Sequence, residues 1–562
     1  MIILGIKSAL HDTSAAIVND GKILAASDEE RFDRKKHSSN FPINSIRFCL
    51  REAKIQNIND VDEIAIGMKW EERGLARFNM RSSHKSSELA NLAAELREAD
   101  RKHESDVEWI MRNNFRYKGP IKFLDHHDCH AASCFFTSNF SSSAIVIIDG
   151  AGEIASSRIY KAQGKKFQKL LQIDYPNSLG KFYGVITDYL GFKMECDEGK
   201  VMALAAYGSD KLVKKMREVL KINDNGTYEL DLSYFDFPKR SGAGVSEKFI
   251  DSFGPKRLPD EEITQQHKDV SKAAQMRFEE AVMSLVKLAK KLTREENLCM
   301  AGGGILNSVS NGKIVNSDIF KNVYIYPAAG DDGVSVGAAL LSYYLHNNER
   351  VFFEENQNPF LGYCATEKEI IDAIKKYNLT YKKCKNVYKD VVKLITQNKI
   401  VGWYSGRTEF GPRALGNRSI IADPREADNK DLLNSKIKKR EYFRPFAPTV
   451  LEEHAKEYFE TQCLSLPYMI VAVNTKKEKR NIIPAVVHID GTARIHTVNK
   501  NQNKRFWNLI NEFYKTTGIP MILNTSFNRR GEPIVNKPSE AIECFLNSGM
   551  DALVLEDFLI IR

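Results

Sequence analysis

The sequence predicts a protein of two α/β units, and three observations support this prediction. The chain has 562 residues, which is too many for one hydrophobic core. Short apolar runs typical of strands alternate with helical patterns along its length. The composition changes at residues 351–359, so we place a boundary near residue 350, between units at 1–350 and 351–562.

Composition excludes several classes of protein. Hydrophobic residues make up 43% of the chain and charged residues 28%, which is typical of a globular protein. We expect no membrane association, because no apolar run approaches the roughly 18 residues of a membrane helix. Residues 1–7 resemble a first strand rather than a leader, so we expect a cytoplasmic location. Nine scattered cysteines without a CxxC pair argue against zinc ribbons and disulfides. The net charge of +9 suits an enzyme with anionic small substrates better than a nucleic-acid binder.

Local patterns place the elements of the first unit. Two apolar runs flank Asn19-Asp20-Gly21, which is a hairpin signal, and a helix follows Pro42. Residues 70–116 look like a charged insertion. A long amphipathic helix at 270–292 precedes a glycine-rich loop. Together these features favour an actin-like nucleotide-binding domain, which is a duplicated RNase H-like fold.

A histidine pair suggests a metal site. His126 and His130 are four residues apart, so on a helix both imidazoles lie on one face. A bare pair of this kind is weak, but carboxylates also follow neighbouring apolar strands, at Asp149 and at Asp331 or Asp332. Two histidines and two aspartates form a mixed nitrogen and oxygen site, which suits Fe(II), Mn or Zn. Such a centre can polarise a carbonyl or phosphoryl oxygen.

Two kinds of loop suggest binding of a nucleotide and of phosphates. Glycines at 302–304 let backbone amides approach a nucleotide, although the loop has neither P-loop nor Rossmann spacing. The second unit has arginines among Gly, Pro and Phe, a context that fixes a guanidinium for gripping phosphates. These arginine-rich segments lie at 406–419, 436–448, 491–494 and 524–533.

At these motifs the chain resembles the nodulation-factor, cephamycin and tobramycin O-carbamoyltransferase family. The resemblance runs almost from end to end. Its motifs are HDTSAA at 11–16, EERF at 29–32, HHDCHAAS at 126–133, EGKVM at 198–202, GDDG at 330–333, GPRALGNRS at 411–419, FRPFAP at 443–448 and NTSFNRRGEPIV at 524–535.

The resemblance implies a two-step enzyme with an actin-like first domain and a YrdC-like α/β second domain. The second domain would combine carbamoyl phosphate and ATP, supplied with Mg, into carbamoyl adenylate and release pyrophosphate. The first domain would then transfer the carbamoyl group to a hydroxyl of a sugar or natural product and release AMP.

The resemblance also implies roles for particular residues. His11 and Asp12 would be catalytic, and the metal, Fe(II) by family habit, would be held by the two histidines named above with Asp149 and Asp331. The adenylate would contact Gly150, Gly303, Gly304 and Asn307. Carbamoyl phosphate and ATP would be bound by Arg413, Lys438, Arg444, Arg494, Asn528 and Arg530, with Arg529 competing with Arg530 for its place.

Other readings stay open at this stage. Hydrogenase-maturation carbamoylation shares both modules, but that family carries an acylphosphatase domain and cysteine zinc fingers. A threonylcarbamoyl-type tRNA-modifying factor would need an extended basic face. An actin-like regulatory ATPase would leave the arginine-rich half without a purpose. The acceptor hydroxyl, the native metal and the oligomeric state, a homodimer included, are not readable from the sequence.

Overall fold

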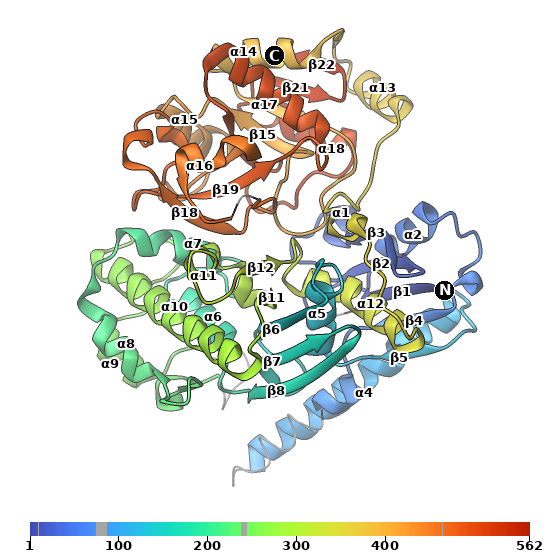
Figure 1. Cartoon of the computed structure of the whole chain (residues 1–562), viewed down its shortest axis with the longest axis vertical. Coiled ribbons are helices and arrows are strands. Elements are labelled where there is room, and N and C mark those ends of the chain that lie inside the picture. Colours follow the sequence, from blue (N-terminus) through green and yellow to red (C-terminus); the bar gives the residue numbers. More distant parts are fainter. Residues whose placement is uncertain (9, 75–86, 238–243, 464) are drawn as a thin grey trace. The chain divides into compact units, whose positions relative to one another are not determined.

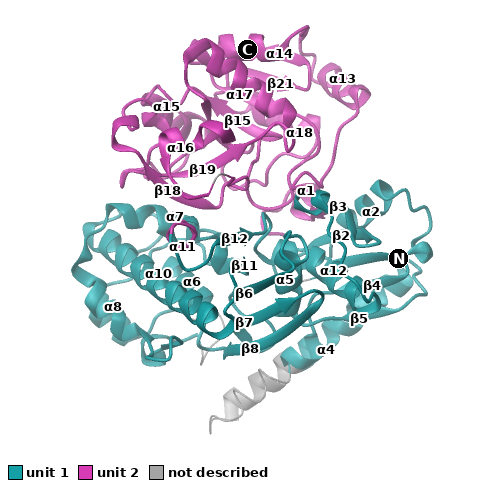
Figure 2. Ribbon diagram, viewed as in Figure 1, with its two compact units in different colours: residues 1–26, 39–310, 317–357 teal, residues 27–38, 311–316, 358–562 magenta. Residues whose placement is uncertain are grey.

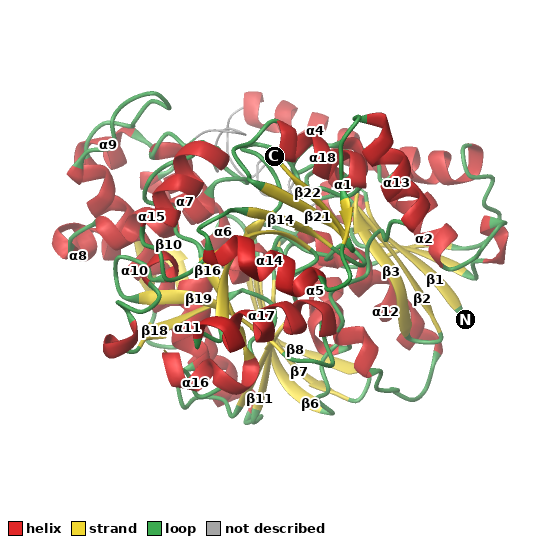
Figure 3. Cartoon of the chain, turned by 90° about the horizontal axis from the view of Figure 1, so that it is seen from above, coloured by secondary structure: helices red, strands yellow, loops and turns green. Residues whose placement is uncertain are grey.

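The computed structural model describes all residues except 9, 75–86, 238–243 and 464, and at 87–97 it describes the backbone only. The chain divides into two compact units, coloured separately in Figure 2. Unit 1 comprises residues 1–26, 39–310 and 317–357. Unit 2 comprises residues 27–38, 311–316 and 358–562, so two short segments that precede residue 358 belong to it. The chain contains both helices and strands (Figure 3).

The first sheet of unit 1 has five strands in the order β3-β2-β1-β4-β5. Strand β1 pairs antiparallel with β2 and parallel with β4, and β4 pairs parallel with β5. The predicted hairpin is confirmed, because Asp20 and Gly21 both have positive φ, as a type I′ turn requires. The strands are β1 (Ile2–Lys7), β2 (Ser14–Asn19), β3 (Lys22–Asp28), β4 (Glu63–Ile66) and β5 (Ile121–Phe123).

The second sheet repeats the same pattern, in the order β12-β11-β6-β7-β8. Here β6 pairs antiparallel with β7 and parallel with β11, and β11 pairs parallel with β12. Two sheets with one shared topology make unit 1 a duplicated, actin-like fold, as the sequence predicts (Figure 1). The strands are β6 (Ser142–Ile148), β7 (Ala155–Gln163), β8 (Lys166–Asp174), β11 (Asn297–Ala301) and β12 (Asn322–Ile325).

Helix α12 (Val334–His346) is packed tightly between elements of unit 1. A Cβ on Gly5 in β1 would lie 2.0 Å from the carbonyl oxygen of Ser335 in α12. A Cβ on Gly337 would lie 1.9 Å from the carbonyl oxygen of Cys129 in helix α5 (His126–Phe135). These close backbone approaches fix α5 and β1 relative to each other. The other helices of unit 1 are α2 (Ile43–Glu52), α4 (Ser87–Asn113), α6 (Leu179–Tyr189), α7 (Glu198–Leu204), α8 (Val213–Val219), α9 (Glu247–Phe253) and α10 (Gln265–Thr293).

Unit 2 is built on one mixed sheet of ten strands, in the order β13-β22-β21-β14-β15-β20-β16-β19-β18-β17. Most neighbours are antiparallel, but β14 runs parallel to β21, and β16 runs parallel to β19. The strands are β13 (Lys382–Lys383), β14 (Val401–Tyr404), β15 (Arg418–Ala422), β16 (Ala447–Leu451), β17 (Phe459–Glu460), β18 (Val471–Thr475), β19 (Thr492–Val498), β20 (Met521–Ser526), β21 (Ala552–Leu555) and β22 (Phe558–Ile561). Its main helices are α13 (Glu367–Lys376), α14 (Val387–Thr396), α15 (Asp428–Leu432), α16 (Ala455–Tyr458), α17 (Lys504–Thr517) and α18 (Pro538–Leu546).

The two N-terminal segments of unit 2 are held by specific contacts within that unit. Segment 27–38 contains α1 (Glu30–Asp33), and the Arg31 side chain donates to the carbonyl of Gly411 at 2.8 Å. Arg34 donates to the carbonyls of Pro533 and Ile534 at 2.9 and 2.8 Å. Segment 311–316 belongs to α11 (Ser308–Val315), where a Cβ on Gly312 would lie 1.7 Å from the Ala472 carbonyl oxygen.

Within the described residues, no helix is both long enough and apolar enough to span a membrane.

The contact between Gly5 and α12 predicts a stability effect. We expect Gly5→Ala to lower the free energy of unfolding by about 1–3 kcal/mol, because the added methyl forces β1 and α12 apart. Thermal melting of the full chain measures this. Gly199→Ala in α7 is the control, since its Cβ would meet no atom within 4 Å. A Gly5→Ala melting temperature equal to that of the parent would contradict the packing described here.

Candidate functional site

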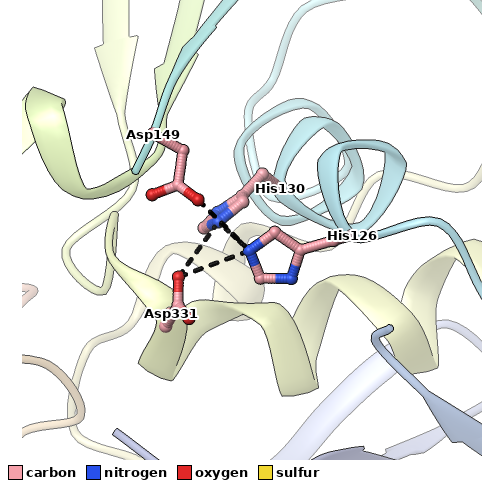
Figure 4. A group of neighbouring side chains, drawn as sticks. All are labelled: His126, His130, Asp149 and Asp331. Carbon is pink, nitrogen blue, oxygen red and sulfur yellow. Dashed lines mark hydrogen bonds and ion pairs between the residues drawn. The ribbon is translucent and has the colours of Figure 1, made fainter. Parts of the chain in front are cut away.

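Two histidines and two aspartates converge in unit 1 (Figure 4). His126 and His130 lie one turn apart on α5, Asp149 follows the end of β6, and Asp331 opens a 3-10 turn that leads into α12. One ligand atom from each of the four side chains lies within 4.8 Å of all the others. All four residues are buried.

The start of α5 is held by carboxylates, which fixes the two imidazoles. The Asp125 side chain accepts from the backbone N–H of Asp128 at 2.9 Å and so caps the helix. Arg158 in turn donates to Asp125 Oδ2 at 2.9 Å. Glu153 Oε1 accepts from the backbone N–H of His126 at 3.0 Å. Helix α5 begins at His126, so the condition under which the two imidazoles share one face is met.

The inward-facing atoms of the cluster form a compact set. His126 Nε2 lies 3.2 Å from His130 Nε2, and 3.4 Å from both Asp149 Oδ2 and Asp331 Oδ1. His130 Nε2 lies 3.5 Å from the same Asp331 oxygen. Two imidazole nitrogens and two carboxylate oxygens are a donor set that suits a divalent transition metal.

Outer contacts turn these atoms inward. His126 Nδ1 lies 3.0 Å from the Gly67 carbonyl, to which it donates, so Nε2 is the nitrogen that faces the cluster. Asp149 Oδ1 accepts from the Gly303 backbone N–H at 3.1 Å, and Asp331 Oδ2 lies 3.0 Å from the ammonium of Lys7. Each of these three side chains therefore has one polar atom engaged by protein and the other directed at the cluster.

The charges of the cluster favour a cation at its centre. Burial alone would lower the pKa of His126, but the carboxylates of Asp331 and Asp149 raise it to about 10. Burial opposes ionisation of Asp331, yet Lys7 and His126 hold the pKa of that carboxyl well below its ordinary value. Two buried carboxylates therefore attract positive charge, which a proton or a metal ion can supply.

The structure separates neighbours that the sequence could not tell apart. Asp331 belongs to the cluster, whereas the carbonyl of Asp332 accepts from the Ser14 hydroxyl at 2.7 Å. His127 follows the first ligand directly but does not belong to the cluster, and burial lowers its pKa to about 3, so its imidazole is neutral.

His11 and Asp12 form a pair beside this cluster. His11 Nδ1 lies 2.9 Å from Asp12 Oδ2. Because a carboxylate can only accept, Nδ1 carries the proton and Nε2 can take one. Burial alone would lower the pKa of His11, but the hydrogen bond to Asp12 and the charge of Asp331 raise it. Asp12 has a φ of 52°, a left-handed conformation that costs energy outside glycine and recurs at functional sites.

The predicted nucleotide-contacting residues lie around Asp149 and in the following loop. Gly303 and Gly304 form a 3-10 turn, and Gly303 contacts Asp149 as described above. A Cβ on Gly150 would meet no atom within 4 Å, so this backbone faces open space. Asn307 exchanges two hydrogen bonds with the Gln275 side chain of α10, at 2.9 and 3.0 Å.

A cluster of cations lies in unit 2, with Lys438 buried and Arg413, Arg440, Arg444 and Arg494 half-buried. Desolvation and the charges of Arg413, Arg440 and Arg444 lower the pKa of Arg494 well below its ordinary value. Desolvation and then Arg444 lower the pKa of Arg413 to about 10 and that of Arg440 to about 9. Desolvation, Arg440 and Arg444 also lower the pKa of Lys438 well below its ordinary value. Like charges gathered where water is partly excluded favour binding of an anion.

Lys438 and Asn528 form the side of this cluster that contacts β20. Lys438 directly follows a π-helical turn at Leu433–Ile437, a feature that often marks functional sites. Its Nζ donates to Asn528 Oδ1 at 2.7 Å and to the Asn528 carbonyl at 3.0 Å. The predicted anion ligands Lys438 and Asn528 thus lie side by side.

The structure distinguishes the two candidate arginines that follow. Arg529 is engaged by Glu532, with its Nε 3.0 Å from Oε1. Arg530 is exposed, donates to the Lys439 carbonyl at 3.2 Å and lies 3.7 Å from Glu441. Arg530 is therefore the more available of the two, although no contact joins it directly to the half-buried arginines among the described residues.

Sequence reasoning missed two members of these clusters. Arg440 lies in the arginine-rich segment 436–448 but was not among the residues expected to bind phosphate, yet it is one of the clustered cations. Lys7 ends the first strand, and nothing in its neighbours indicated contact with Asp331, which is more than 300 positions away. A lysine at the end of the apolar run 2–6 is the one sequence feature that could have pointed to Lys7.

The fold and the two clusters place the chain in the class of two-unit α/β proteins. Its actin-like unit carries a cation-attracting cluster, and its second α/β unit carries an anion-attracting cluster.

Family comparison then gives the particular family. Residues 2–340 match the model of the carbamoyltransferase N-terminus, and residues 392–562 match that of the carbamoyltransferase C-terminus. The chain belongs to the carbamoyltransferase family and is a carbamoyltransferase enzyme, as its motifs predict.

Similar proteins include two with nodulation names. The nodulation protein NolNO of Sinorhizobium fredii is 37% identical over 98% of this chain and 79% of its own length. NolO of Bradyrhizobium diazoefficiens is 39% identical over 78% of each chain. An uncharacterized protein of Synechocystis sp. is 37% identical over 100% of this chain and 96% of its own.

Solved structures show more distant likeness. Component A of (R)-2-hydroxyglutaryl-CoA dehydratase from Acidaminococcus fermentans is 15% identical with a TM-score of 0.34, over 61% of this chain and 98% of its own. HypF of T. kodakarensis is 14% identical with a TM-score of 0.30, over 61% and 48%.

The geometry of the histidine–aspartate cluster predicts metal binding. We expect about one transition-metal ion per purified chain, and most of it lost in His130→Ala, because one of four ligands is removed. Elemental analysis of both proteins measures this. His127→Asn, next to a ligand but outside the set, should keep its metal. Equal metal content in His130→Ala and the parent would rule out this ligand set.

Proposed function

We propose that this chain is an ATP-dependent O-carbamoyltransferase that works in two steps, one in each unit. Unit 2 makes carbamoyl adenylate from carbamoyl phosphate and ATP, supplied with Mg. Unit 1 transfers the carbamoyl group to a hydroxyl of a sugar or natural-product acceptor and releases AMP. Both phosphorylated substrates belong to the cytoplasm, where we expect the enzyme to act.

The observation that supports this proposal most is the division of charge between the units. The ligand set that attracts a cation lies wholly in unit 1. The mutually repelling cations lie wholly in unit 2 and are the buried Lys438 and the half-buried Arg413, Arg440, Arg444 and Arg494. Carbamoyl phosphate and ATP are polyanions, so the second cluster suits them. The first suits a step in which charge develops on a leaving phosphate.

In the first step, atoms balance only if two anions leave. Carbamoyl phosphate reacts with water to give carbamate and phosphate, and a carbamate oxygen then attacks the α-phosphorus of ATP and expels pyrophosphate. We propose that the arginines of the unit 2 cluster bind the phosphate groups of both substrates. Lys438, held by Asn528, offsets negative charge on the phosphate and pyrophosphate that leave.

In the second step, the acceptor oxygen attacks the carbamoyl carbon and AMP leaves. His11 Nε2 can take the hydroxyl proton, because Asp12 holds the other ring nitrogen as a donor. Gly150, Gly303, Gly304 and Asn307 would line the adenylate in this unit. A divalent ion in the cluster, which we propose is Fe(II), would supply Lewis-acid stabilisation of phosphate oxygens.

Arg444 provides a direct test of the anion site. We expect Arg444→Ala to raise the KM for carbamoyl phosphate about tenfold to a hundredfold, since a charge-assisted hydrogen bond contributes roughly 1.5–3 kcal/mol. Pyrophosphate release as a function of carbamoyl phosphate measures this. Arg425→Ala is the matched control, because Asp423 already pairs with that guanidinium. An unchanged carbamoyl-phosphate dependence in Arg444→Ala would remove this residue from the site.

The two-step scheme predicts that the unit in which a substitution lies decides which of the two steps is lost. Arg413→Ala or Lys438→Ala should abolish pyrophosphate release, because no adenylate forms. His130→Ala or Asp149→Ala should leave pyrophosphate release measurable but stop carbamoyl transfer, followed by mass spectrometry of the acceptor. Synthetic carbamoyl adenylate should rescue transfer in the unit 2 variants and not in the unit 1 variants.

Single-turnover measurement separates a block of adenylation from slow release of the adenylate. Adenylate that stays bound could slow pyrophosphate release in unit 1 variants without affecting the first step. If His130→Ala blocked adenylation in one turnover as completely as Arg413→Ala, one composite site would replace the two-site scheme.

A further inference from the structure

Lys7 is a buried lysine in direct contact with the histidine–aspartate cluster. It ends β1, and only 1% of its surface is exposed. Its Nζ lies 3.0 Å from Asp331 Oδ2 and donates to the His11 carbonyl oxygen at 3.5 Å. A lysine this buried is rare and carries a desolvation cost, so its charge needs a reason.

The contact between Lys7 and Asp331 gives the two Asp331 oxygens different partners. Oδ1 faces the histidines, 3.4 Å from His126 Nε2 and 3.5 Å from His130 Nε2. Oδ2 is taken by the ammonium of Lys7. Asp149 is divided in the same way by the Gly303 backbone N–H on Oδ1. Each carboxylate can thus offer a cation one oxygen rather than two, which leaves coordination positions for another ligand.

Lys7 also changes the charge of the occupied cluster. The two carboxylates supply two negative charges, which a divalent ion would cancel. Lys7 adds one positive charge beside them, so the occupied cluster is positive overall. A positive, partly open centre attracts anionic oxygen ligands, and a neutral one does so less.

We propose that Lys7 is a positioning residue that holds Asp331 as a one-oxygen ligand and thereby makes the metal-bearing cluster a receptor for phosphate oxygens. The proposal rests on the metal site in unit 1 given under the proposed function. The ligand class is a phosphate monoanion or dianion, such as inorganic phosphate or a nucleoside monophosphate.

A purely structural role for Lys7 makes a different prediction. If the lysine only neutralises Asp331 so that unit 1 can fold, its loss would lower stability and leave anion affinity unchanged. If it positions Asp331, its loss frees the second oxygen to occupy the coordination position of the phosphate. Stability and phosphate affinity together distinguish the two roles.

The test uses the full chain loaded with Co(II), whose visible absorption reports its coordination. Inorganic phosphate and AMP are titrated separately into the parent protein, Lys7→Met, Lys7→Arg and Lys22→Met. We expect phosphate to bind Lys7→Met about tenfold more weakly or worse, the range typical of lost outer contacts. Lys7→Arg should bind it nearly as the parent does. Lys22→Met, which removes an exposed ion pair with Glu355, should be unchanged.

The outcomes separate this inference from the proposed function. Equal phosphate affinity in Lys7→Met and the parent overturns the role of Lys7 and leaves the metal site standing. A parent protein that binds no Co(II) overturns the metal site itself. Loss of Co(II) from folded Lys7→Met also overturns the proposal, because a freed second oxygen of Asp331 should hold the ion at least as well. If thermal melting shows that Lys7→Met does not fold, Lys7→Gln takes its place. Its amide can still donate to Asp331 but it lacks the positive charge, so weaker phosphate binding than in the parent is still expected, and equal affinity overturns the proposal.

Discussion

A charged side chain that loses its hydration must be stabilised by groups of opposite charge or by hydrogen bonds, and this constraint determines the arrangement of both clusters. Asp149 and Asp331 are buried together, where two carboxylates would repel each other and each would lose its hydration. Lys7, the Gly303 backbone N–H and two imidazoles answer that cost. The strands and α5 are arranged so that these groups meet, and the tight packing of α12 between β1 and α5 holds the arrangement in place.

Unit 2 presents the same constraint with the opposite sign. Arg444 lowers the pKa of Arg413, of Arg440 and of Arg494, while Glu441 raises that of Arg440 and lies 4.0 Å from Arg444. Such a cluster is costly to fold and is at its most stable with an anion bound. The protein thus stores in unit 2 an unfavourable interaction that an anionic ligand relieves, which is a physical basis for binding rather than for fold stability.

Features set by local sequence were predictable, and features set by distant partners were not. The hairpin at Asn19-Asp20-Gly21 and the proximity of His126, His130 and Asp149 follow from turn residues, helical spacing and strand ends. The choice of Asp331 over Asp332 depends on a 3-10 turn that adjacent aspartates do not reveal. The membership of segment 27–38 in unit 2 depends on partners such as Gly411, 380 positions from Arg31, for which one sequence contains no local signal.

That segment has a consequence for anyone who would rebuild this enzyme from parts. Residues 27–38 begin at the end of β3 and are flanked on both sides by residues of unit 1. Their arginines nevertheless donate to backbone carbonyls of the Gly411 and Pro533 loops. A gene fragment beginning at residue 358 would lack those donors. Swapping C-terminal halves between relatives at one junction would therefore separate unit 2 from two of its own segments. A working chimaera has to carry residues 27–38 and 311–316 with the half to which they belong in space.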